Sequence, residues 1–165
     1  MTQVMSNLHR LLKHHSITDV SVGFPHYGAL NVYGSQTLGE VVRLVSEDKD
    51  HLSLIKGNVT FKTLVSVGVL EFSNPTAVPE DAKEVRFYKD SKPSKKMKLL
   101  KQAPSVTEKP SYAKIERSSV ILLIERQDGS KYPIFVSRLT ANNQTKGQYN
   151  SYGLSQQDGP TFPIF

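Results

Sequence analysis

The chain has 165 residues, with 21 Lys or Arg against 15 Asp or Glu, for a formal net charge of +6. This length suffices for one domain, or two small ones, with a core that needs no covalent staples. The absence of cysteine excludes disulfides, thiolate zinc sites and cysteine nucleophiles. No apolar run reaches the roughly 18 residues of a membrane span, and the N-terminus lacks the apolar stretch of a signal peptide. We therefore expect an intracellular protein, neither secreted nor transmembrane.

The first half of the chain predicts short helices and strands. Apolar residues at three- and four-residue steps predict an amphipathic N-terminal helix of about 12 residues, with an apolar face formed by Val4, Met5, Leu8, Leu11 and Leu12. Alternating apolar residues predict strands over 17–24 and 28–34. The capping-box spacing of Thr37 and Glu40 predicts a second helix that ends near residue 46. Extended structure is then predicted over 51–55, 59–72 and 85–89.

The second half of the chain divides by composition. Residues 91–114 are rich in Lys and Pro, and proline at this spacing prevents a long helix, so we predict an exposed linker or loop. Residues 115–139 hold two apolar runs around Asp128-Gly129, which is typical of a β-hairpin that completes the core or forms a separate module. Residues 140–165 are polar and predict a flexible arm that becomes ordered against a partner.

These elements predict an α+β fold whose core spans residues 1–90. Its sheet should be mainly antiparallel, because several strands follow one another across short turns. An N-terminal helix and one further short helix, an exposed basic linker and an extended C-terminal arm complete the expected architecture.

Local catalytic motifs do not occur in the sequence. A P-loop, a dinucleotide-binding glycine motif and a nucleophile elbow are all missing. The five histidines contain no H-x-x-x-H pair, and we interpret them as surface or helix-end residues: His9, His14, His15, His26 and His51. The acidic groups resemble solvated loop charge. No catalytic residue, metal site, cofactor or small-molecule substrate is therefore expected.

Most of the net charge lies in residues 89–101, named here the lysine segment. It contains one acidic residue, Asp90, and six lysines: Lys89, Lys92, Lys95, Lys96, Lys98 and Lys101. Such lysines can neutralise RNA or DNA phosphates with little sequence preference. They can also bind anionic lipid headgroups, form a nuclear import signal, or keep a linker solvated. Phosphate binding, on nucleic acid or lipid, is the function that we assign to these residues.

Two short proline motifs suggest a family. Residues 162–165, FPIF, look like the FPIV-type late-domain motif of some viral matrix proteins, and residues 75–78, PTAV, are similar to the PTAP type. With its small size, basic segment and terminal arm, the chain resembles viral matrix proteins, including the smaller ones of rhabdoviruses. This resemblance implies a non-enzymatic structural protein of the virion that self-associates, condenses the nucleocapsid and bridges it to the envelope.

The expected partners follow from these features. Self-association is predicted through the N-terminal helix and the C-terminal arm, at Leu8, Leu11, Leu12, Tyr149, Tyr152, Phe162 and Phe165. The other expected partners are nucleoprotein or RNA, and an anionic membrane surface, in the cytoplasm or nucleus of a host cell. The alternative function is an RNA-binding accessory protein, such as a silencing suppressor or a nuclear factor. An enzyme is the third hypothesis, because an active site can be assembled across a fold.

Overall fold

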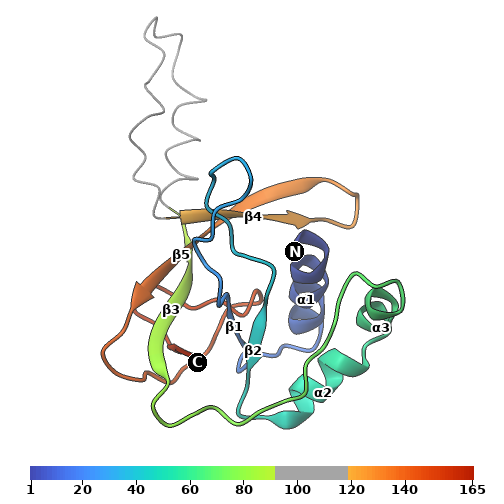
Figure 1. The fold of residues 1–165 in the computed structure, drawn as a ribbon. Helices are drawn as coiled ribbons and strands as arrows, with labels where there is room; N and C mark the ends of the chain where they lie inside the picture. Colours follow the sequence, from blue (N-terminus) through green and yellow to red (C-terminus); the bar gives the residue numbers. More distant parts are fainter. Residues whose placement is uncertain (92–118) are drawn as a thin grey trace, which may run out of the picture.

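The computed structural model describes residues 1–91 and 119–165. They form an α+β fold, which confirms the predicted fold class. Its elements follow one another along the chain (Figure 1) as α1 (Thr2–His14), β1 (Ser21–Gly23), β2 (Arg43–Val45), α2 (Lys49–Gly57), α3 (Val59–Ser66), β3 (Lys83–Asp90), β4 (Ser119–Glu125), β5 (Lys131–Thr140) and β6 (Phe162–Ile164).

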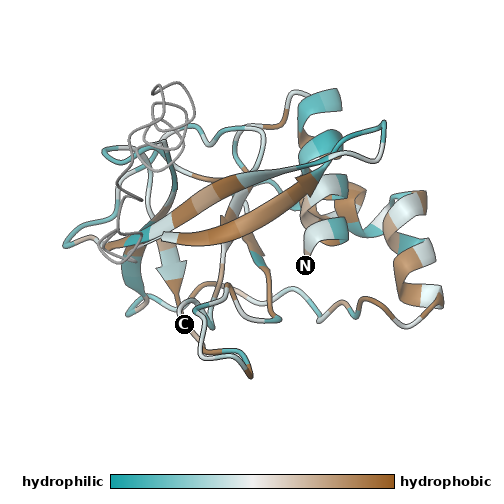
Figure 2. Ribbon diagram, turned by 90° about the horizontal axis from the view of Figure 1, so that it is seen from above, coloured by the Kyte–Doolittle hydropathy of each residue, from teal (hydrophilic) through white to brown (hydrophobic). Residues whose placement is uncertain are grey.

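Four antiparallel strands form the main sheet, in the order β4-β5-β3-β6. Strands β4 and β5 make the hairpin that Asp128-Gly129 predicted, with Glu125 opposite Lys131 at the turn. Strand β5 also pairs with β3, so the hairpin and the first half of the chain share one sheet. Alternate residues of β4 face the core, namely Val120, Leu122 and Ile124. Figure 2 shows these long strands as mainly apolar ribbons.

Helix α1, which the apolar face of its sequence predicted, packs against β4 of the same chain (Figure 1). Leu8 and Leu12 are each only 1% exposed. Ser6 is buried on the same side of the helix; its hydroxyl donates to the Thr2 carbonyl at 2.7 Å and accepts from the Glu125 backbone N–H at 2.8 Å. This hydrogen bond joins the helix to the end of β4, next to the hairpin turn.

Residues 37–72 differ from the prediction. The expected helix over 37–46 contains β2 instead, which pairs with β1, and Gly39 has a φ of 79° that a right-handed helix does not allow. The expected strand over 59–72 begins as helix α3, whose N-terminus is capped by the Asn58 side chain. Phe61 and Leu64, three residues apart, supply its buried face. Its β-branched residues favour a strand locally, but burial of this face prevails.

The segment predicted as a flexible arm, 140–165, packs on the body of the protein. Leu154 is fully buried and Phe162 is 2% exposed, within a segment whose residues before Phe162 are mostly polar. The Ser155 N–H donates to the Phe87 carbonyl at 2.8 Å, and the Phe162 ring contacts the Phe87 ring at 5.7 Å between centroids. Strand β6 then pairs with β3. The buried side chains of Leu154 and Phe162 thus anchor this mostly polar segment to the main sheet.

Candidate active site

His9 and Tyr152 bring the two ends of the chain together. His9 lies on α1, next to buried Leu8, and its ring stacks on that of Tyr152 with centroids 4.0 Å apart and planes 9° from parallel. The His9 Nδ1 atom lies 3.0 Å from the Ser151 carbonyl oxygen. Because a carbonyl can only accept, the proton of the neutral imidazole belongs on Nδ1. The Nε2 atom therefore carries the lone pair of a ring held in a fixed orientation.

The surroundings of His9 favour its neutral form. Burial lowers the pKa of His9 below 6.5, and the bond to the Ser151 carbonyl acts in the opposite direction. The positive charges of Lys13, Lys89 and Arg10 lower the pKa further. At neutral pH this histidine is therefore ready to accept a proton, in a setting whose cations attract phosphate.

Tyr152 connects His9 to further aromatic and cationic side chains. The hydroxyl groups of Tyr152 and Tyr132 lie 2.7 Å apart. Burial and this hydrogen bond raise the pKa of the Tyr152 hydroxyl, so it stays protonated at neutral pH. The Lys89 Nζ lies 5.5 Å from the centroid of the Tyr152 ring, and the Arg126 guanidinium lies 4.8 Å from that of Tyr132. Aromatic rings interleaved with cations are typical of nucleic-acid-binding surfaces.

The His9 side chain borders a cleft of about 960 Å³ between α1, the start of α3 and the β4–β5 turn. We call it the α1–hairpin cleft. Its basic residues include Arg10 and Lys13 from the helix and Arg126 from the turn. These three cations outnumber the two carboxylates of the cleft, Glu125, which lies 3.9 Å from the Lys131 ammonium, and Asp128, which accepts from Ser130. The cleft therefore suits an anionic ligand.

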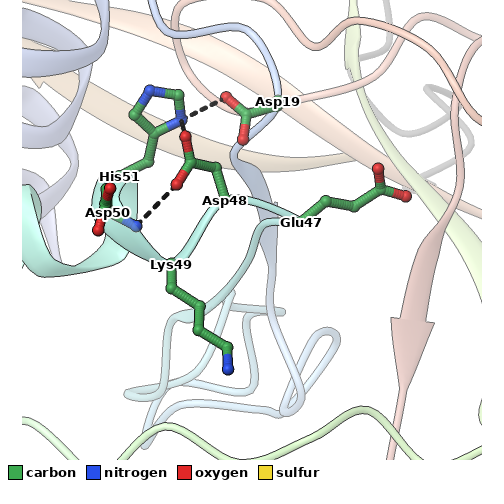
Figure 3. Close-up of a pocket in the computed structure, with 6 residues that line it drawn as sticks. All are labelled: Asp19, Glu47, Asp48, Lys49, Asp50 and His51. Carbon is green, nitrogen blue, oxygen red and sulfur yellow. Dashed lines mark hydrogen bonds and ion pairs between the residues drawn. The ribbon is translucent and has the colours of Figure 1, made fainter.

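A second hollow, shown in Figure 3, has the opposite charge. It is lined by Asp19, Glu47, Asp48, Lys49, Asp50 and His51. The His51 Nδ1 lies 2.7 Å from an Asp19 carboxylate oxygen, which raises the pKa of His51. Asp48 caps helix α2 by accepting from the Asp50 N–H at 2.8 Å. Four carboxylates repel phosphate, and no group of three or more potential metal ligands occurs within residues 1–91 and 119–165. The acidic residues of this hollow are therefore explained by their place at the capped N-terminus of helix α2.

The predicted phosphate-binding residues are described only in part. Lys89 lies on β3, beside Tyr152. The remaining five lysines lie outside the described residues, as does nearly all of the predicted linker over 91–114: Lys92, Lys95, Lys96, Lys98 and Lys101. Their role in binding phosphate stays a prediction.

The residues predicted for self-association occupy different environments. Leu8, Leu11 and Leu12 are buried in the core of the chain itself, and Phe162 is buried between strands. The Tyr149 hydroxyl donates to the Thr161 carbonyl. Phe165 is 39% exposed, and the Arg43 guanidinium lies 4.2 Å from the centroid of its ring. Tyr152 holds His9. Self-association itself stays a prediction.

Our interpretation of His9 as a surface or helix-end residue missed the contacts of its ring. One signal was present in the sequence: Met5, His9 and Leu12 share the three- and four-residue spacing of the buried face of α1. The contacts themselves come from Ser151 and Tyr152 at the far end of the chain, and local patterns do not report such pairs. The partners of His9 could therefore be found only in the folded structure.

One comparison with known proteins identifies the family. The model of a family described as CRISPR-associated protein (Cas_Csy4) matches residues 1–165. No curated protein matches the chain. The resemblance to rhabdovirus matrix proteins is wrong, and with it the expected virion, because it depended on overall build and four-residue motifs whereas the match spans the chain.

The predicted function changes accordingly. A non-enzymatic matrix-type protein is wrong, because proteins of the matched family are CRISPR endoribonucleases. The alternative, an RNA-binding accessory protein, is closer because the family binds RNA, but it does not match an RNA-processing protein. Among the described residues, no helix has the length and apolar character needed to cross a membrane.

Proposed function

The chain belongs to the Cas_Csy4 family of CRISPR-associated proteins, and we propose that it is an endoribonuclease that cleaves CRISPR RNA with His9 as the proton acceptor. The observation that carries the assignment of His9 is its fixed ring, stacked on Tyr152 and bonded through Nδ1 to the Ser151 carbonyl. We infer that the enzyme acts inside a prokaryotic cell, where CRISPR RNA is made.

The chemistry that suits this geometry uses the RNA's own 2′-hydroxyl. His9 Nε2 takes the proton of that hydroxyl, and the oxygen forms a bond to the adjacent phosphorus as the bond from phosphorus to the 5′-oxygen breaks. The leaving oxygen takes up a proton, so the products end in a 2′,3′-cyclic phosphate and a 5′-hydroxyl. The lowered pKa keeps His9 unprotonated for the first step. The positive charge of Lys89 favours the growing negative charge on the phosphate.

The assignment is tested by replacing His9 with Ala and with Gln. We expect single-turnover cleavage of end-labelled CRISPR RNA to fall about 10²- to 10⁴-fold, since general base catalysis contributes that much. Binding of an RNA with a 2′-deoxy nucleotide at the cleaved position should stay close to that of the wild type. Exposed His26 provides the matched control, and His26→Ala should cleave normally. Wild-type cleavage by His9→Ala, or cleavage of the 2′-deoxy RNA, would contradict the proposal.

The other partners expected from the sequence are separate from this proposal. The family match does not support contact with further copies of the chain, with nucleoprotein or with an anionic membrane, and RNA is the partner that we propose.

A further inference from the structure

The α1–hairpin cleft extends beyond what cleavage by His9 requires. Lys13 follows His9 by four residues and lies on the same face of the helix, about 6 Å further along its axis. Both side chains border the cleft. A phosphate held by Lys13 would therefore belong to a nucleotide next to the one that His9 acts on.

Arg126 supplies a positive charge from the opposite wall, on the turn between β4 and β5. The contact of its guanidinium with the Tyr132 ring, at 4.8 Å, orients it without neutralising it. The four ion pairs of the described residues include neither Lys13 nor Arg126. Neither cation is therefore held in a close ion pair, although the charge of Arg126 also acts on the nearby Asp128 carboxyl, adding to the hydrogen bonds from Ser130 that lower its pKa most.

The size of the cleft limits what this ligand can be. A volume of about 960 Å³ is that of a small-molecule site, too small to enclose a double helix but sufficient for a short single strand. Tyr132 adds an aromatic face beside the two cations, and single strands bind such combinations through base stacking and phosphate contacts.

We propose that the α1–hairpin cleft binds the single-stranded part of the RNA next to the cleaved bond, with Lys13 and Arg126 on its phosphates. This inference rests on the proposed function, because the strand is placed by the bond that His9 attacks. It adds a substrate requirement: the enzyme should bind an RNA more tightly when unpaired nucleotides continue past the cleaved position.

The test measures RNA binding by fluorescence anisotropy. The probes are CRISPR RNAs in which a 2′-deoxy nucleotide at the cleaved position blocks the reaction. In one series the RNA either ends on the 3′ side of that position or continues there for about four unpaired nucleotides, and a second series varies the 5′ side in the same way. The variant is Lys13→Gln with Arg126→Gln. Its control, Lys56→Gln with Lys62→Gln, removes the same charge from exposed positions of α2 and α3.

We expect one of the two extensions to tighten wild-type binding about tenfold at low salt, and the cleft variant to lose that gain. The slope of log affinity against log salt should decrease by about 1.4, the value for two phosphates of a single strand. The control variant should retain the gain. The proposal is overturned if neither extension tightens wild-type binding, if the cleft variant keeps the gain, or if it loses affinity equally for the unextended RNA.

The experiments distinguish a failure of the cleft proposal from a failure of the proposed function. A His9→Ala protein that cleaves normally would remove the catalytic assignment, whatever the binding data. A normal dependence on the extension in the Lys13 and Arg126 variant would remove the cleft proposal and leave His9 in place.

Discussion

His9 has a lowered pKa, and this property can be measured from the pH dependence of the proposed cleavage. In the proposed mechanism the unprotonated ring is the active form, so the rate should be constant above the pKa of His9 and fall as pH decreases through it. Since burial and neighbouring cations place that pKa below 6.5, the fall should be centred below 6.5. We expect a tenfold loss for each further pH unit.

This pH profile is measured under single-turnover conditions with saturating enzyme. The residual activity of His9→Ala should show no such inflection. A wild-type rate that rises as the pH decreases would identify a protonated group as essential and contradict the assignment.

Sequence reasoning found parts of the candidate site but not their arrangement. Tyr152 was predicted to contact another subunit, and Lys89 to bind phosphate on a solvated segment. In the structure the Lys89 ammonium lies over the Tyr152 ring, and that ring stacks on His9. The residue types were recognisable from composition, whereas their proximity depends on contacts between distant segments that periodicity does not encode.

At the scale of elements, a hydrogen bond to the Ser6 hydroxyl connects α1 to the end of β4. Replacing Ser6 with Ala leaves the Glu125 N–H without its partner, and such a loss costs about 1–3 kcal/mol. Because this bond fixes the helix beside the hairpin turn, we expect lower stability to urea together with slower cleavage.

Ser53→Ala is the matched control for Ser6→Ala. The Ser53 hydroxyl makes the same kind of bond, to the Lys49 carbonyl one turn earlier, but it is exposed and joins no other element. Its loss should change stability by about 0.5 kcal/mol or less. Equal effects of the two substitutions would contradict the role given to Ser6.

The elements differ in how well the sequence predicted them. Helix α1 and the β4–β5 hairpin carry strong signals, an apolar face of helical period and a turn flanked by apolar runs. Residues 37–72 contain β-branched residues in short runs, where helix and strand give similar patterns. There the pairing of β2 with β1 and the burial of Phe61 and Leu64 decide the structure.

At the scale of the whole molecule, the C-terminal segment is part of the core. Gly23 on β1 lies directly under the Phe162 ring, and a β-carbon at Gly23 would overlap that ring. Gly23→Ala must therefore displace the ring or the strand. We expect a loss of about 1–3 kcal/mol in the free energy of unfolding, with faster trypsin cleavage after Lys146.

The control for Gly23→Ala is Gly57→Ala at the end of α2. Outside its chain neighbours and the backbone of its own helix, no atom lies within 4 Å of the added β-carbon, so the stability of the variant should be unchanged or slightly higher. If Gly23→Ala melts at the wild-type temperature and resists trypsin equally, the docking of the C-terminal segment contributes little to the fold.

The stack of His9 on Tyr152 also bears on the order in which the protein is made. A ribosome adds His9 early and Tyr152 much later, so a translation product that stops before residue 151 lacks both groups that hold the His9 ring. Such a product would also lack Leu154 and Phe162 of the core and strand β6 of the sheet, so neither the fold nor the His9 site would be complete. Because His9 and Ser151 are 142 residues apart in the sequence, cleavage under the proposed function would begin only after translation has passed Tyr152.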